Sequence, residues 1–212
     1  MTQEPQARER ITVFSDYVCP FCYLGRQSLA QYQEERTEPL AIDWRPFDLR
    51  AQKRGPDGDI DATADDGKDE TYYEQARENV RRLQEAYDAE MSQEIATDVD
   101  SRPAQAVSYR VKETESYETW LAFDRAIFEA LWVDGRDIGD AAVLVDCAAE
   151  AGLDPDTVHG ALRDDDPFAR IDDLFAEAQA QGITGVPTFV YDGHAARGAV
   201  PPAQLERLVE GA

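Results

Sequence analysis

The stretch Cys19-Pro20-Phe21-Cys22 holds two thiols three residues apart, and this spacing decides how the chain is interpreted. The apolar run Ile11-Thr12-Val13-Phe14 before it predicts a strand, and the run from Leu24 to Tyr32 after it predicts a helix. The pair therefore falls where a strand passes into a helix. There the first thiol would lie near unpaired N–H groups and the positive end of the helix dipole, which favour a thiolate. A thiolate with a second thiol within reach can exchange disulfides.

Length and composition are those of a globular protein. The 212 residues, 42% of them hydrophobic, suffice for one large domain or for a domain with an insertion. No run approaches the ~18 consecutive apolar residues that span a bilayer. The polar start Met1-Thr2-Gln3-Glu4-Pro5 has neither the basic nor the apolar region of a secretory signal. We therefore expect a cytoplasmic protein without a membrane segment.

The charge balance is strongly acidic, with 44 acidic and 21 basic residues and a net charge of −23. Lysine occurs only at Lys53, Lys68 and Lys112. Such a surface repels phosphate backbones and anionic lipid, which excludes nucleic-acid and membrane-surface binding as expected functions. Many acids with few lysines resemble proteins from cells that accumulate salt, where ions screen the self-repulsion. The composition therefore predicts an acidic, halophilic-like surface.

The N-terminal two thirds of the chain predict a strand–helix–strand unit, a loop and a set of helices. Strands are predicted at 11–15 and 40–47, and this order favours a parallel pair with a right-handed crossover. The Gly-, Pro- and Asp-rich residues 51–69 predict an acidic flexible loop. Residues 70–163 predict helices almost throughout, and one apolar repeat runs through Val80, Leu83, Tyr87 and Met91.

The C-terminal part predicts a return to mixed structure. A helix is expected from Pro167 to Gly182, followed by a strand and by the tight-turn signal Asp192-Gly193 of a hairpin. Pro201-Pro202 would open a last helix. An α/β domain formed by residues 1–50 and 167–212, with a helical domain inserted at 70–166, fits this order of elements.

A second motif, Gly185-Val186-Pro187-Thr188, stands at the start of the predicted C-terminal strand, where proline cannot donate to the sheet. Taken alone it is an ordinary strand-edge proline with a trans bond. Together with the cysteine motif and a few further segments, it makes the sequence resemble the DsbA family of the thioredoxin superfamily, and within it the cytoplasmic FrnE-like members. The further segments are Trp44-Arg45-Pro46-Phe47, Gly135-Arg136-Asp137-Ile138-Gly139 and Gly182-Ile183-Thr184.

This resemblance implies a thioredoxin-like α/β fold that is interrupted by an all-helical domain. It further implies a cis Val186–Pro187 bond that lies against the cysteine pair. Val186 would offer backbone hydrogen bonds to a bound peptide or thiol, and Pro20, Phe21 and Pro187 complete the implied substrate-binding set. The implied activity is thiol–disulfide exchange with protein or low-molecular-weight substrates.

The residues themselves assign the two cysteines different roles. Cys19, nearer the helix start, is the expected nucleophile, and Cys22, one turn inside, is the expected resolving thiol. The pair is itself the redox centre, so no metal, flavin or nucleotide cofactor is implied. A zinc site would need these two thiols with Cys147 and either His159 or His194, yet the sequence has no second CxxC and no HxxxH motif. Cys147 lies on an apolar helical face and is expected to be a buried small hydrophobe.

Two other functions remain open on the same scaffold. The chain also resembles the group of 2-hydroxychromene-2-carboxylate isomerases and kappa-class glutathione transferases. Those enzymes usually carry serine in place of the first cysteine, whereas this chain has both thiols. The pair permits closure of an intramolecular disulfide and so favours redox chemistry. A peptide-binding chaperone with a catalytically idle pair is the other alternative.

Overall fold

A computed structural model gives the structure of residues 9–55, 58–61, 64 and 67–211. Four strands form one sheet in the order β2-β1-β3-β4. The strands are β1 (Glu9–Ser15), β2 (Leu40–Pro46), β3 (Thr188–Tyr191) and β4 (His194–Arg197). The helices are α1 (Pro20–Glu35), α2 (Glu70–Ala86), α3 (Arg102–Thr114), α4 (Tyr117–Trp132), α5 (Ala141–Glu150), α6 (Pro155–Arg163), α7 (Asp165–Ala180) and α8 (Pro202–Glu210), with a short 3₁₀ helix, η1 (Ala51–Lys53).

The strand–helix–strand unit forms as predicted. Helix α1 connects β1 to β2, and these two strands pair in parallel, with Val13 opposite Trp44. Strand β3 pairs antiparallel with β1 on its other side, and β4 returns beside β3. The turn between β3 and β4 is Asp192-Gly193, and both residues have positive φ, 46° and 78°. This is the backbone that the predicted tight turn requires.

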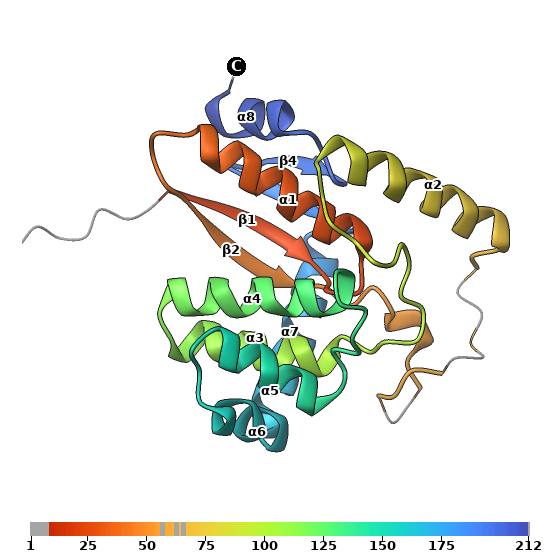
Figure 1. Cartoon of the computed structure of the whole chain (residues 1–212), viewed down its shortest axis with the longest axis vertical. Helices are drawn as coiled ribbons and strands as arrows, with labels where there is room; N and C mark the ends of the chain where they lie inside the picture. The colour runs from red at the N-terminus through yellow and green to blue at the C-terminus, as the bar shows by residue number, and fades with distance from the viewer. Residues whose placement is uncertain (1–8, 56–57, 62–63, 65–66, 212) are drawn as a thin grey trace, which may run out of the picture.

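Alternation along the strands separates two faces of the sheet. Val13 and Phe189 are opposite each other and buried at 1% and 0% exposure, on the face that α1 covers. Thr12 and Phe14 lie on the other face, where Phe14 packs with Ala178 of α7. Figure 1 shows α1 and α8 together at one side of the sheet, with α7 behind it.

The helical block, defined here as α3 to α6, packs beside β2 (Figure 1). Its side chains bond to the outer backbone groups of that edge strand. The Ile42 N–H donates to the Tyr117 hydroxyl over 2.8 Å, and Lys112 Nζ donates to the Trp44 carbonyl over 2.7 Å. One main apolar cluster runs through the sheet and the block. The edge of the sheet is therefore closed by the block.

Two expected helix boundaries were wrong. Helix α2 ends at Ala86, because Asp88 adopts a positive φ of 48° and Ala89 N donates back to the Gln84 carbonyl over 3.0 Å. Met91 lies beyond the helix but still packs against the core, which explains why the apolar repeat continued to it. The predicted helix at Pro167 begins earlier, at Asp165, because the Asp164 carboxylate caps it by accepting from Asp166 N.

Part of the predicted loop at 51–69 has local structure. It contains η1 and a bridge between Arg54 and Ile60. Arg54 pairs with Asp48 over 2.6 Å and with Asp100 over 2.8 Å, which ties the loop to the body of the protein. Residues 56–57, 62–63 and 65–66 of the predicted loop, and the polar start at 1–8, lie outside the described residues. The division into an α/β domain and an inserted helical domain stays a prediction.

Close packing at Gly25 gives a first testable consequence. A Cβ at Gly25 in α1 would lie 3.1 Å from the Phe189 ring and 3.1 Å from the Pro187 ring, whereas one at Gly160 in α6 would meet nothing within 4 Å. Alanine is favoured over glycine in a helix by about 1 kcal/mol, but overpacking a rigid site costs about 1–3 kcal/mol. We expect Gly25→Ala to lower the free energy of unfolding by about 0–2 kcal/mol, the difference between the two effects, and Gly160→Ala to raise it by about 1 kcal/mol. Urea denaturation measures both, and equal stabilisation by the two variants would contradict the packing at Gly25.

Candidate functional site

The cysteine pair lies at the junction of β1 and α1. Cys19 is the N-cap residue of α1, with extended backbone angles of −94° and 115°. Pro20 occupies the first helical position, where its missing N–H is no loss. Cys22 N donates to the Cys19 carbonyl over 3.0 Å, and Cys19 N donates to the Asp16 carbonyl over 3.1 Å. The turn therefore fixes both cysteines at the start of the helix.

The Cys19 sulfur faces the segment before β3. Its thiol donates to the Val186 carbonyl over 3.6 Å, and no first-turn N–H of α1 donates to it as a cap. The Val186–Pro187 peptide bond is cis. Cys19 is 3% exposed, and Cys22 is 0% exposed. The structure thus brings Cys19 and Val186 together, two residues that are 167 positions apart in the chain.

Cys22 is the deeper thiol. Burial raises its pKa well above the ordinary value, and a hydrogen bond to Cys19 and the charge of Cys19 raise it further. Cys22 therefore stays protonated at neutral pH unless another group takes its proton. The two thiols differ in environment as well as in depth, with access from outside at Cys19 alone.

A cavity of about 660 Å³ opens beside Cys19. Its walls come from the cysteine motif, the segment 47–53 after β2, the start of α2, the segment 95–97 and the segment 183–186. Pro20, Phe21 and Val186, three of the residues expected to bind substrate, line it. Pro187 does not line the cavity; its ring packs against α1 at Gly25. This size falls within the ~300–1,000 Å³ of small-molecule sites.

The comparisons with known proteins agree with this architecture. The profile of the DSBA-like thioredoxin domain matches residues 10–210. This chain belongs to the DSBA-like thioredoxin domain family. The predicted family and the predicted thioredoxin-like α/β fold are both confirmed.

Relatives of this DSBA-like domain span nearly its whole length. The protein YwbO of Bacillus subtilis, described as uncharacterized, is 25% identical over 205 residues, which is 94% of each chain. A probable DsbA oxidoreductase from Streptomyces coelicolor is similar in structure, with a TM-score of 0.74, 25% identity and coverage of 95% of this chain and 88% of the other.

Two more solved structures share the fold at lower identity. A 2-hydroxychromene-2-carboxylate isomerase matches with a TM-score of 0.76, 18% identity and coverage of 93% and 92%. The cytosolic disulfide reductase DsbM from Pseudomonas aeruginosa, in its structure with GSH, matches with a TM-score of 0.58, 20% identity and coverage of 94% and 92%. Enzymes of different activity therefore use this fold. The activity of a member must be inferred from the residues of its site and not from the fold.

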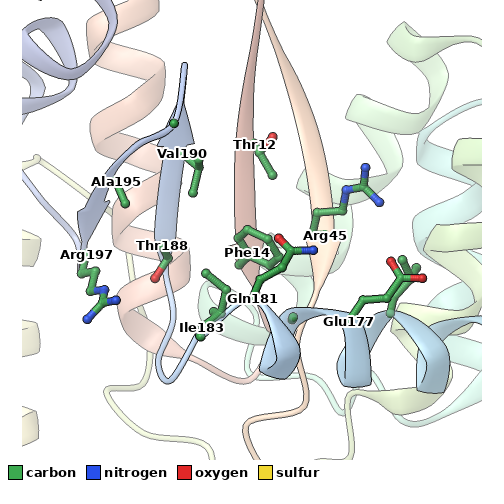
Figure 2. A pocket seen from close by; sticks show the side chains of 14 residues that line it. Thr12, Phe14, Arg45, Glu177, Gln181, Ile183, Thr188, Val190, Ala195 and Arg197 are labelled. Atoms are coloured by element: carbon green, nitrogen blue, oxygen red, sulfur yellow. The ribbon is translucent and has the colours of Figure 1, made fainter.

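A second hollow of about 440 Å³ lies on the opposite face of the sheet, between the strands and α7. Figure 2 shows Thr12, Phe14, Thr188 and Val190 directed into it from β1 and β3, with Gln181 at its mouth. None of its described lining residues is a cysteine, and its buried hydroxyl, that of Thr188, donates to the Gly185 carbonyl over 2.8 Å. The cysteine motif of this DSBA-like domain lines the other cavity.

Asp16 is a buried residue at the site and was not among the predicted site residues. It is 0% exposed, and its carboxylate accepts hydrogen bonds from Val18 N (3.2 Å), Leu49 N (2.8 Å) and Gln105 Nε2 (3.2 Å). Burial raises the pKa of Asp16 to about 6, against the opposing effect of these hydrogen bonds. One acid inside the otherwise apolar run before the cysteines was the signal that pointed to it.

The shift at Asp16 predicts how stability depends on pH. Its pKa is about 6 in the folded protein against 3.8 for the unperturbed group, so the folded state holds the proton more tightly. Binding of this proton by Asp16 stabilises the folded state. The stabilisation is fully present below about pH 4 and is lost as the pH rises through about 6. The free energy of unfolding of the wild type should therefore fall by about 3 kcal/mol relative to Asp16→Asn between these limits. Denaturation of both proteins across this range measures the difference, and parallel pH curves would show that Asp16 does not titrate there.

Two further sequence-based expectations concern Cys147 and a possible zinc site. Cys147 is 1% exposed on α5, and burial raises its pKa to about 12, as suits the inert small hydrophobe that was predicted. Across residues 9–55, 58–61, 64 and 67–211, no three His, Cys, Asp or Glu side chains gather as metal ligands. Within the same residues, no helix has the length and apolar character to cross a membrane.

Proposed function

We propose that the protein is a thiol–disulfide oxidoreductase whose redox centre is Cys19 and Cys22. One observation carries the proposal: Cys19 lines a cavity of substrate size, and a fully buried second thiol stands directly behind it. A single nucleophilic thiol would suffice for isomerase or transferase chemistry on this fold. Two thiols in this order permit a disulfide to close between them.

The reaction proceeds in two exchanges. The Cys19 thiolate attacks one sulfur of a substrate disulfide, so that a mixed disulfide forms and the first substrate thiolate leaves. Cys22 then gives up its proton and attacks the Cys19 sulfur, which releases the second substrate thiolate and closes the Cys19–Cys22 disulfide. Two electrons pass from the dithiol to the substrate, and each departing thiolate takes up a proton. The reverse sequence oxidises a substrate dithiol.

The neighbouring residues position the substrate in this proposal. Pro20 and Phe21 form the wall next to the nucleophile, and the Val186 carbonyl already accepts a hydrogen bond from Cys19. A substrate backbone N–H can take the place of the Cys19 thiol at that carbonyl once the thiol has ionised. Pro187 acts through its packing against α1, which fixes the height of Val186 above the sulfur.

The proposal includes the surroundings of the protein. The pair needs no bound cofactor, its substrates are protein or low-molecular-weight thiols and disulfides, and its place is the cytoplasm. Three cysteines, an odd number, do not make the disulfide framework that is typical of a secreted protein. A surface of net charge −23 repels the phosphates of nucleic acids, so nucleic acid is not among the proposed partners.

Counting thiols tests this function. The reduced protein has three free thiols. An excess of a linear small disulfide such as bis(hydroxyethyl) disulfide should consume the two thiols of the pair and leave Cys147, and the mass should fall by two hydrogens. Insulin reduction then measures turnover with a dithiol as the reductant. Protein that keeps all three thiols under these conditions, while folded, has no dithiol activity.

A further inference from the structure

The residues that line the cavity beside Cys19 include more bases than acids, which is the opposite of the balance in the whole chain. Acids outnumber bases 44 to 21 in the sequence, but the described lining residues include three bases, Arg50, Lys53 and Lys68, and one acid, Asp48. The Asp48 carboxylate is engaged by Arg54, with Nε and Oδ2 2.6 Å apart. Bases therefore outnumber acids three to one among the described lining residues, inside a protein of strongly negative charge.

The lysines make this placement specific. The chain has three lysines, and two of them, Lys53 and Lys68, line the one cavity. Lys53 ends η1, and Lys68 stands just before α2 with its Nζ 5.6 Å from the centre of the Tyr72 ring. Lys112 lies elsewhere, bound to Asp43 and to the Trp44 carbonyl at the edge of the sheet. A surface selected only for acidity would not gather its scarce lysines beside the reactive thiol.

Arg50 supplies a buried charge with an open hydrogen-bonding position. The residue is 9% exposed; its Nη2 donates to the Ala96 carbonyl, while its Nη1 is buried and has no hydrogen-bond partner among the described residues. A guanidinium stays charged, and leaving a buried donor unsatisfied costs about 1–3 kcal/mol. The carboxylates of Asp16, Asp100 and Asp98 attract it, but none of them accepts a hydrogen bond from its Nη1. A carboxylate brought by a ligand would satisfy it.

The rest of the lining limits the size and character of the ligand. Aromatic and aliphatic side chains face the basic groups, namely Phe21, Phe47, Tyr72, Tyr73, Ile95 and Ile183. A cavity of about 660 Å³ holds a small molecule and not a folded surface. An acidic protein would meet the net charge of −23 before it reached the cavity, whereas a small anion in salt responds mainly to charges within about a Debye length, ~8 Å.

We propose that Arg50, Lys53 and Lys68 select a low-molecular-weight disulfide that carries carboxylates, and hold a carboxylate of it while Cys19 attacks its sulfur. This inference rests on the dithiol chemistry proposed above and names its substrate class. For a disulfide RSSR, the Cys19–S–R bond forms as the S–S bond breaks and RS⁻ leaves. Cys22 then displaces the second RS⁻, so that RSSR gains two electrons and two protons and the enzyme dithiol becomes a disulfide.

Three short disulfides with two methylenes between each sulfur and its polar group, and with different charge, provide the probes: dithiodipropionate with two carboxylates, bis(hydroxyethyl) disulfide with no charge, and cystamine with two ammonium groups. Each reacts in single turnover with the reduced protein, and each rate is divided by the rate of the same disulfide with dithiothreitol, which removes differences in intrinsic reactivity. The net charge of the protein by itself favours cystamine. We expect the opposite order, with the dicarboxylate ahead of the neutral probe by about tenfold, the effect of one charge-assisted hydrogen bond.

Single substitutions then show which side chains produce the preference for the dicarboxylate probe. Lys53→Gln, Lys68→Gln and Arg50→Gln should each reduce the ratio of dicarboxylate to neutral rate by about three- to tenfold. Lys112→Gln removes the same charge outside the cavity and should leave both rates unchanged. If Arg50→Gln fails to fold, the two lysine variants carry the test, because their side chains are not part of the core.

The outcomes separate this inference from the proposed function. Oxidation of the pair by the neutral probe, with no preference for the dicarboxylate or with a preference that survives in all three cavity variants, overturns the selection and leaves the dithiol chemistry standing. Failure of every probe to oxidise the pair overturns the dithiol chemistry, and the selection with it. A preference lost equally in Lys112→Gln assigns the effect to net charge and also overturns the selection.

Discussion

Replacement of Cys19 by serine should reduce disulfide exchange to the rate without protein, a loss on the order of a thousandfold or more, as expected when a nucleophile is removed. A hydroxyl is not ionised near neutral pH and does not cleave disulfides, whereas its size lets it fill the same position. Cys19 is buried but its thiol makes one long hydrogen bond, to the Val186 carbonyl, so the fold should be little affected. Insulin reduction measures the activity, and urea denaturation measures the stability.

Cys22→Ser is the matched control because it removes the other thiol of the pair. Cys19 can still attack in this variant, but nothing resolves the mixed disulfide, so the protein should gain the mass of one substrate thiol and stop. Cys147→Ala should behave as wild type in exchange, since that thiol is buried on α5. Full turnover by Cys19→Ser would exclude the proposed mechanism outright.

Replacement of Asp124 by alanine should lower the free energy of unfolding by about 3–5 kcal/mol, the cost of leaving a buried ion pair without one partner. Asp124 in α4 is 1% exposed and pairs with Arg26 of α1, whose side chain is 13% exposed. It also accepts a hydrogen bond from the Tyr17 hydroxyl over 3.0 Å, and Tyr17 in turn bonds with Ser108 over 2.7 Å. Removal of the carboxylate leaves the Arg26 guanidinium without its charge partner and takes one of two hydrogen-bond partners from the Tyr17 hydroxyl, at the contact between the cysteine-bearing helix and the helical block.

Asp172→Ala tests whether burial is the cause of the large loss of stability expected for Asp124→Ala. Asp172 pairs with Arg102 over 2.7 Å, but its side chain is 51% exposed, and exposed pairs contribute about 0–1 kcal/mol. The double replacement Arg26→Met with Asp124→Leu should recover part of the stability lost in Asp124→Ala, since a buried pair can be exchanged for apolar groups of similar volume. Equal losses for Asp124→Ala and Asp172→Ala would show that the buried network contributes no more than a surface pair.

Short sequence patterns predicted those parts of the fold that depend on neighbouring residues alone. The cysteine motif marked the β1–α1 junction, and Asp192-Gly193 marked the hairpin turn because only a few residues adopt its backbone. The end of α2 could not be predicted this way. Met91 carries on the apolar repeat, yet it reaches the core from a loop, and tertiary packing produces the same spacing as a helix would.

The site was predicted only in part for the same reason. Cys19 and Val186 were named together through the family resemblance, and the structure places them in contact. The basic side of the cavity was missed because Lys53 and Lys68 stand in a tract whose composition indicates a solvated loop. Arg50 gave no signal at all: its burial depends on the segment 95–97, which is distant in sequence. The scarcity of lysine was the one available hint.

The closed edge at β2 has a consequence for how this protein behaves in brine. At about 1 M salt the Debye length falls to ~3 Å, and a charge of −23 no longer keeps molecules apart. Open strand edges are then the places where chains stick together. Tyr117 and Lys112 occupy the outer groups of β2, and the opposite edge, β4, offers only four residues. At the β2 edge, Tyr117 and Lys112 therefore reduce the number of backbone groups to which a neighbouring chain could bond, independently of charge.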